Sequence, residues 1–108
     1  MRKFEKSSFE KFSEDIKNDQ KLYDNYLLPK RSTINSAGYD FFALEDFSLQ
    51  PNEIKHISTG VKVKLNHDEV LLLLVRSSMG FKYNIRMCNQ VGVIDSDYYN
   101  NIDNEGHI

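Results

Sequence analysis

The chain has 108 residues, which suits one domain, and its 14 Lys and Arg nearly balance 16 Asp and Glu, for a net charge of −2. This composition offers no basic field for nucleic acid, and the longest apolar run, six residues, is too short for a membrane helix of about 20. The one cysteine, Cys88, excludes an intramolecular disulfide framework, so a reducing cytoplasm is the expected compartment, with neither nucleic acid nor a membrane as partner.

Residues 7–26 are expected to be helical and to pack on the body of the domain, although a partner-binding helix is an alternative. The apolar stripe that predicts the helix consists of Phe9, Phe12 and Ile16. Ser7 and Glu10 fit a capping box at its start. The polar residues 17–20 weaken the periodicity, so one bent helix and two short helices both remain open.

After Pro29 the apolar period changes from helical to alternating, which indicates strands. Strands are expected at 38–49, 60–65, 70–76 and 85–95, with turns at 50–53 and 66–69 and a polar break at 77–80. The strand at 60–65 should be half-buried, and the run VLLLLV, Val70 to Val75, should be fully buried. Short strands without alternating helices predict a mostly-β sandwich or barrel.

Three polar stretches interrupt the expected strands: SAGYD, RSSMG and GVIDSDY. The second, RSSMG, directly follows the most apolar strand. Arg76 offers a planar fork of donors that suits phosphate oxygens, and Ser77 and Ser78 add short donors. A polar turn whose serines bond their own backbone is the plainer interpretation.

The third stretch, GVIDSDY, leads from an apolar strand into acids and tyrosines, with Asn89 just upstream. Asn89 can pair with an amide-like edge such as that of uracil, and Tyr98 is a flat surface for a base or sugar. Asp95 could take a proton from water as a general base. A strand end with solvated acids would explain the same residues without any ligand.

Together with SAGYD at residues 36–40, these stretches resemble in order and wording the first three motifs of the trimeric dUTP diphosphatase (dUTPase) family. The resemblance covers about Leu28 to Tyr99. It implies a mostly-β, dUTPase-like jelly roll, or β-clip barrel, at residues 28–108, incomplete at its C-terminus, behind a helical extension at residues 1–27. It also implies a homotrimer with shared active sites and the hydrolysis of dUTP to dUMP and diphosphate, which limits uracil in DNA and supplies dUMP for dTMP synthesis.

The same resemblance implies a role for each site residue. Asp95 would activate the attacking water, and Tyr98 would pack under the deoxyribose. Uracil would be read by Asn89 and by the backbone of Val93 and Ile94, and phosphates would be held by Arg76, Ser77 and Ser78. Asp40 would support the water shell of a magnesium ion that the substrate phosphates hold, with no direct protein ligand.

The sequence departs from the family pattern in two places. Asn100 stands where the family commonly has glycine, and we expect the turn to survive because asparagine tolerates the left-handed conformation. The fourth and fifth motifs and the last strands have no counterpart before Ile108, so we expect a fragment with little activity of its own.

Two other functions stay open beside dUTP hydrolysis. One is a non-catalytic, nucleotide-binding regulatory or interaction protein derived from a dUTPase. The other is dCTP deaminase, which shares the RSS stretch but is matched less well by GVIDSDY with Asn89 upstream.

Overall fold

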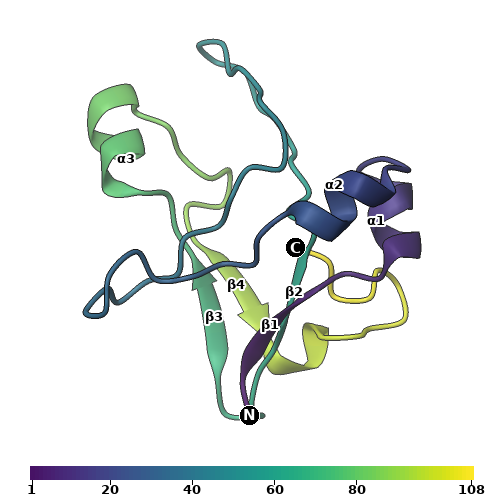
Figure 1. The fold of residues 1–108 in the computed structure, drawn as a ribbon. Helices are drawn as coiled ribbons and strands as arrows, with labels where there is room; N and C mark the ends of the chain where they lie inside the picture. The colour runs from purple at the N-terminus through teal and green to yellow at the C-terminus, as the bar shows by residue number, and fades with distance from the viewer.

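Two small antiparallel sheets form the body of the protein in the computed structural model, which describes residues 1–108. β1 (Lys3–Lys6) pairs with β2 (Val61–Lys64), and β3 (Val70–Leu73) pairs with β4 (Gly92–Asp95). Figure 1 shows the two pairs side by side, with the helices α1 and α2 beside one end of β2 and α3 beyond the end of β3.

The first sheet combines one expected strand with one that the sequence did not predict. β2 is half-buried as expected, because Val61 and Val63 are buried while Lys64 is exposed. β1 was missed, since its charged sequence KFEK carries little apolar alternation. Its register, with Phe4 opposite Val63, shows that the N-terminal segment adds a strand to the body as well as helices.

The predicted helix at residues 7–26 is two short helices, α1 (Phe9–Asp15) and α2 (Gln20–Asn25). The expected cap at Ser7 is wrong: Ser8 is the N-cap, and its Oγ accepts the backbone N–H of Lys11 at 3.1 Å. Asp19 caps the second helix by accepting the N–H of Leu22 at 3.0 Å. A cap at Asp19 starts a new helix and explains the break at the polar residues.

Phe12 is the centre of the buried core and has no exposed surface. It packs against an aromatic cluster made of Phe9, Tyr23 and Tyr26. The Tyr26 hydroxyl donates to the carbonyl of Gly60 at 2.6 Å, at the start of β2. The helices therefore pack on the body of the domain, as the apolar stripe predicted.

The strand expected at residues 38–49 does not form. Asp40 makes an isolated bridge with Lys30, and the residues that follow have no strand partner. Tyr39 and Phe41 pack against Phe4 of β1, with ring centroids 5.5 and 5.7 Å apart. The aromatic alternation in this segment thus reflects side-chain packing on β1 rather than a hydrogen-bonded ladder.

Three further expectations about strands are corrected. The VLLLLV strand is only half-buried, because Val70, Leu72 and Leu74 are 50, 53 and 66% exposed. The polar break at 77–80 begins a helix, α3 (Ser77–Tyr83). The extended segment at 85–95 is a strand only from Gly92 onward.

The turns at 50–53 and 66–69 are present, closed by backbone hydrogen bonds of 3.0 Å from Glu53 to Gln50 and from Glu69 to Asn66. No membrane-spanning helix is found, since every helix falls short of the length and apolar character that a bilayer requires. The division of the chain at residues 27 and 28 stays a prediction.

Candidate active site

Asp95 is the last residue of β4 and the residue that caps η1 (Ser96–Tyr98), a single 3₁₀ turn. Its carboxylate is exposed, and its ladder partner is Val70. Paired residues of an antiparallel ladder share one face, so Asp95 stands at the end of the face that carries Leu72 and Val93. The acid predicted as a general base is thus at the rim of an exposed apolar surface.

Gly92 begins β4, and a side chain there would crowd the neighbouring strand. A Cβ at this position would lie 3.0 Å from the Cβ of Leu73, its ladder partner. The other edge of β4 is open, since β3 is its only neighbour in the sheet. In an antiparallel ladder every second residue points both its N–H and its C=O away from the partner strand, so one of Val93 and Ile94 presents its backbone groups to this open edge.

Tyr98 ends η1 beside the carboxylate of Asp95, and both line a pocket of about 410 Å³. The Tyr98 hydroxyl donates to the carbonyl of His107 at 3.2 Å and accepts from Nδ2 of Asn104 at 2.6 Å. The complete lining is Val93, Asp95, Asp97, Tyr98, Asn101, Asp103 and Asn104. The structure thus brings together the predicted residues Val93, Asp95 and Tyr98.

The residues of this pocket that the sequence did not suggest lie in the turn after Tyr99. Oδ1 of Asn101 accepts the backbone N–H groups of Asp103 and Asn104, at 2.9 and 3.0 Å. Asn100 has φ of 56°, which confirms that asparagine takes the left-handed conformation here. The run of Asn, Asp and Gly is a turn signal, and it could have predicted the turn that forms this side of the pocket.

The second motif lies away from this pocket. Arg76 caps α3, and Ser77 and Ser78 form the first turn of that helix, all three exposed. Since Asp95 pairs with Val70, Arg76 is six positions further along, up to about 20 Å away at ~3.3 Å per residue. Figure 1 shows α3 and η1 at opposite ends of the β3–β4 pair.

Two other predicted residues are also outside the Asp95 pocket. Asn89 lies in a tight turn in which its carbonyl accepts the N–H of Val91 at 2.8 Å and Gln90 has φ of 67°. The backbone of Asp40 is tied to Lys30 by bonds of 2.8 and 3.3 Å. One chain therefore does not assemble all the predicted site residues in a single cavity.

Carboxylates dominate the charge of the pocket, because Asp95, Asp97 and Asp103 all line it. Oxygen donors of this kind suit magnesium. No three His, Cys, Asp or Glu residues come close enough to hold a metal by themselves. The donor set fits an ion that takes most of its ligands from phosphates and water.

A larger hollow of about 550 Å³ lies between β1, β2 and β3, with walls that include Phe4, Val63 and Leu71. None of the predicted site residues lines it. The predicted site residues therefore place the candidate site at the smaller pocket beside Asp95.

Comparison with known proteins decides the family. The dUTPase family model matches residues 24–103, a range that contains all three motifs. The chain belongs to the dUTPase family. The predicted fold class, mostly β and a dUTPase-like jelly roll, is confirmed by the crystal structure of dUTPase from Streptococcus mutans, which matches with a TM-score of 0.72 and 41% identity over 97% of this chain and 73% of that one.

Curated relatives are named deoxyuridine 5'-triphosphate nucleotidohydrolase. The relative from Lactococcus lactis subsp. lactis is 54% identical over 81 residues, which are 75% of this chain and 54% of that protein. The relative from Histophilus somni is 42% identical over 83 residues, 74% of this chain and 55% of that protein. The chain thus spans about half the length of these relatives.

Proposed function

We propose that the protein at its natural length hydrolyses dUTP to dUMP and diphosphate. The observation that carries the proposal is the placement of Asp95 and Tyr98 in one pocket at the open end of β4. Curated relatives of the chain are named deoxyuridine 5'-triphosphate nucleotidohydrolase, which supports the proposal. The reaction would limit uracil in DNA and supply dUMP for dTMP synthesis in the cytoplasm.

The base and sugar are bound by groups around β4. The open edge of Val93 and Ile94 offers backbone donors and acceptors to uracil, and the side chain of Asn89 adds an amide. The ring of Tyr98 packs under the deoxyribose. The two hydrogen bonds of the Tyr98 hydroxyl fix the orientation of the ring. A 2′-hydroxyl has no room against that ring, which excludes ribonucleotides.

Asp95 is the general base. Its exposed carboxylate takes a proton from a water molecule as the water oxygen bonds to the α-phosphorus. The bond from the α-phosphorus to the oxygen that bridges to the β-phosphorus breaks, and diphosphate leaves with that electron pair. The products are dUMP and diphosphate, and the proton remains on Asp95 until solvent removes it.

The phosphate chain is held by Arg76, Ser77 and Ser78, whose exposed donors project from the start of α3. When bound with the substrate phosphates, magnesium would neutralise charge on the leaving diphosphate. Asp40 would support the hydration shell of the ion. None of these side chains is within the Asp95 pocket of the same chain.

The apolar face at Asp95 supports a site in which the second and third motifs come from different copies of the chain. Val70, Leu72 and Leu74 are exposed beside Val93, which is 57% exposed. A second copy that covers this face buries apolar surface and brings its own α3 toward Asp95. Three copies around a threefold axis form three equal clefts, so we propose a homotrimer with shared sites.

Substrate preference tests the proposed function. The protein at its natural length, with magnesium, should hydrolyse dUTP in clear preference to dCTP and UTP, measured as diphosphate release. Cytosine presents the wrong hydrogen-bond pattern to Asn89, and a mismatch leaves polar groups unsatisfied. Equal turnover of all three nucleotides would contradict the pocket assignment, and binding of dUTP without turnover would favour a non-catalytic regulatory protein.

A further inference from the structure

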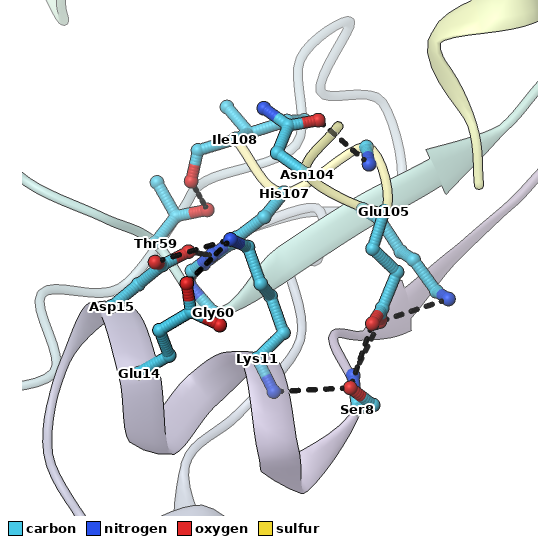
Figure 2. A network of polar contacts seen from close by, with 12 residues as sticks. Ser8, Lys11, Glu14, Asp15, Thr59, Gly60, Asn104, Glu105, His107 and Ile108 are labelled. Carbon is cyan, nitrogen blue, oxygen red and sulfur yellow. Dashed lines mark hydrogen bonds and ion pairs between the residues drawn. The ribbon is translucent and has the colours of Figure 1, made fainter. Parts of the chain in front are cut away.

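The segment Asn104–Ile108 lies between α1 and the start of β2 (Figure 2), and the side chain of His107 hydrogen-bonds to both. The His107 side chain is only 2% exposed. Its Nε2 accepts the backbone N–H of Gly60 at 2.8 Å, so this nitrogen carries no proton. The remaining proton is on Nδ1, which donates to Oδ2 of Asp15 at 2.6 Å.

Glu105 fastens the same segment to the first turn of α1. Its carboxylate accepts the backbone N–H of Ser8 at 2.5 Å and the Ser8 hydroxyl at 2.7 Å, and it pairs with Lys62 of β2 at 3.2 Å. Burial by itself would raise the pKa of Glu105, but these contacts hold it below its ordinary value. Both ends of α1 therefore contact the segment, the N-terminal end through Ser8 and the C-terminal end through Asp15.

The opposite side of the segment supports Tyr98. The carbonyl of His107 and Nδ2 of Asn104 hold the tyrosine hydroxyl, at 3.2 and 2.6 Å. Gly106, at φ of 86°, packs so closely that a Cβ would lie 2.7 Å from the carbonyl oxygen of Tyr98. A shift of the segment must therefore move the ring of Tyr98.

We propose that α1 positions Tyr98 through Asp15 and His107 at one end and Ser8 and Glu105 at the other, and thereby sets the sugar selectivity of the pocket. The inference rests on the proposed function, because sugar selectivity has meaning only for a nucleotide pocket. Asp15, Glu105 and His107 are positioning residues, since they act on the substrate only through Tyr98. A helix outside the three motifs thus takes part in substrate choice.

Two neighbouring carboxylates of α1 provide a matched pair of variants. Asp15 and Glu14 both approach Nζ of Lys11, at 3.3 and 3.7 Å, but only Asp15 contacts His107. Asp15→Ala removes the acceptor for Nδ1, while Glu14→Ala removes the same charge from the same helix. Asp15→Asn restores an oxygen acceptor and should rescue the first variant. Glu105→Ala removes the contacts of this segment with Ser8 and Lys62, and replaces Asp15→Ala if that variant proves too unstable to purify.

The first readout is the ratio of kcat/KM for dUTP to kcat/KM for UTP. The folded fraction of a variant cancels from this ratio, so a merely structural role would leave it unchanged. Asp15→Ala should lower the ratio about tenfold or more, because small misplacements of a positioning group cost up to about a hundredfold. Glu14→Ala and Asp15→Asn should stay near the unmodified ratio. An unchanged ratio in both Asp15→Ala and Glu105→Ala would overturn the proposal.

The second readout does not depend on turnover. With 3-fluorotyrosine incorporated, the ¹⁹F resonance of Tyr98 can be assigned by its loss in Tyr98→Phe. It should shift in Asp15→Ala and remain in place in Glu14→Ala. If the Tyr98 resonance does not shift in Asp15→Ala, then α1 does not position the ring. If the unmodified protein fails to hydrolyse dUTP, the proposed function fails, yet this resonance still decides whether α1 and Tyr98 are coupled.

Discussion

Asp95 stands directly opposite Val70 in the β3–β4 ladder, at the end of the hairpin that is remote from α3. This register separates the acid of the third motif from the serines of the second, which follow the other end of β3. The same register puts Asp95 on the exposed apolar face. A site that needs both motifs would therefore draw them from two copies of the chain, as we propose.

Replacement of Asp95 by asparagine tests the role of the carboxylate. Asparagine keeps size and polarity but cannot accept the proton of water. General-base assistance is typically worth ~10²–10⁴ in rate, so kcat for dUTP should fall by at least about a hundredfold, with dUTP affinity largely kept. Rapid-quench turnover and a binding titration measure the two quantities. Near-normal turnover by Asp95→Asn would show that another group takes the proton.

Gly106→Ala should destabilise the protein by at least about 2 kcal/mol, because an alanine at φ of 86° is strained and its Cβ collides with the Tyr98 backbone. Gly38→Ala is the matched control, since nothing lies within 4 Å of a Cβ there. Urea unfolding followed by circular dichroism compares the two. Equal midpoints for both variants would rule out the close packing of Gly106 on Tyr98.

Phe12→Ala should cost about 3–5 kcal/mol of unfolding free energy, the usual cost for a buried phenylalanine. Phe12 is fully buried among aromatic rings that join α1 and α2 to the body. Phe81→Ala removes the same side chain from a site that is 94% exposed on α3, and should change stability little. Similar losses from both substitutions would mean that the aromatic cluster is not the core.

Acid should loosen the contacts of α1. Burial opposes ionisation of Asp15 and Glu105, yet hydrogen bonds from His107 and Ser8 lower their pKa values below the ordinary 3.8 and 4.5. The stability they contribute is therefore complete above pH 4.5 and is lost as the pH falls through these values and below. Thermal unfolding between pH 7 and pH 3 should show a steeper decline for the unmodified protein than for Glu105→Gln. Parallel declines would mean that folding does not lower the pKa of Glu105.

The sequence predicted best where one local rule acted alone. The alternation of Val61 and Val63 with lysines predicted a half-buried strand. The GVIDSDY stretch predicted site roles for Asp95 and Tyr98, and both line one pocket. Periodicity failed where tertiary packing decided, as for Tyr39, whose ring rests on β1 outside any ladder. No local pattern marked β1 as a strand, because its charged residues pair with β2 from far along the chain.

The residues that contact the Tyr98 hydroxyl show why part of the site could not be predicted. Asn104 and His107 both contact the tyrosine hydroxyl, and His107 is itself bonded to Asp15 and Gly60, which are distant in sequence. The apolar run of β3 was misjudged for a related reason. Its composition indicates burial, and one face of the strand finds no cover within the chain.

The shared site is the central claim, and subunit mixing tests it most directly. Full-length Ser77→Ala and full-length Asp95→Asn proteins, each nearly inactive alone, are dissociated together and allowed to reassemble, with exchange confirmed by native mass spectrometry. Random assembly creates some clefts in which an intact Ser77 from one copy faces an intact Asp95 from another, so dUTP hydrolysis should reappear in the mixture. A fully exchanged mixture that stays as inactive as its parents would contradict a site built from two copies.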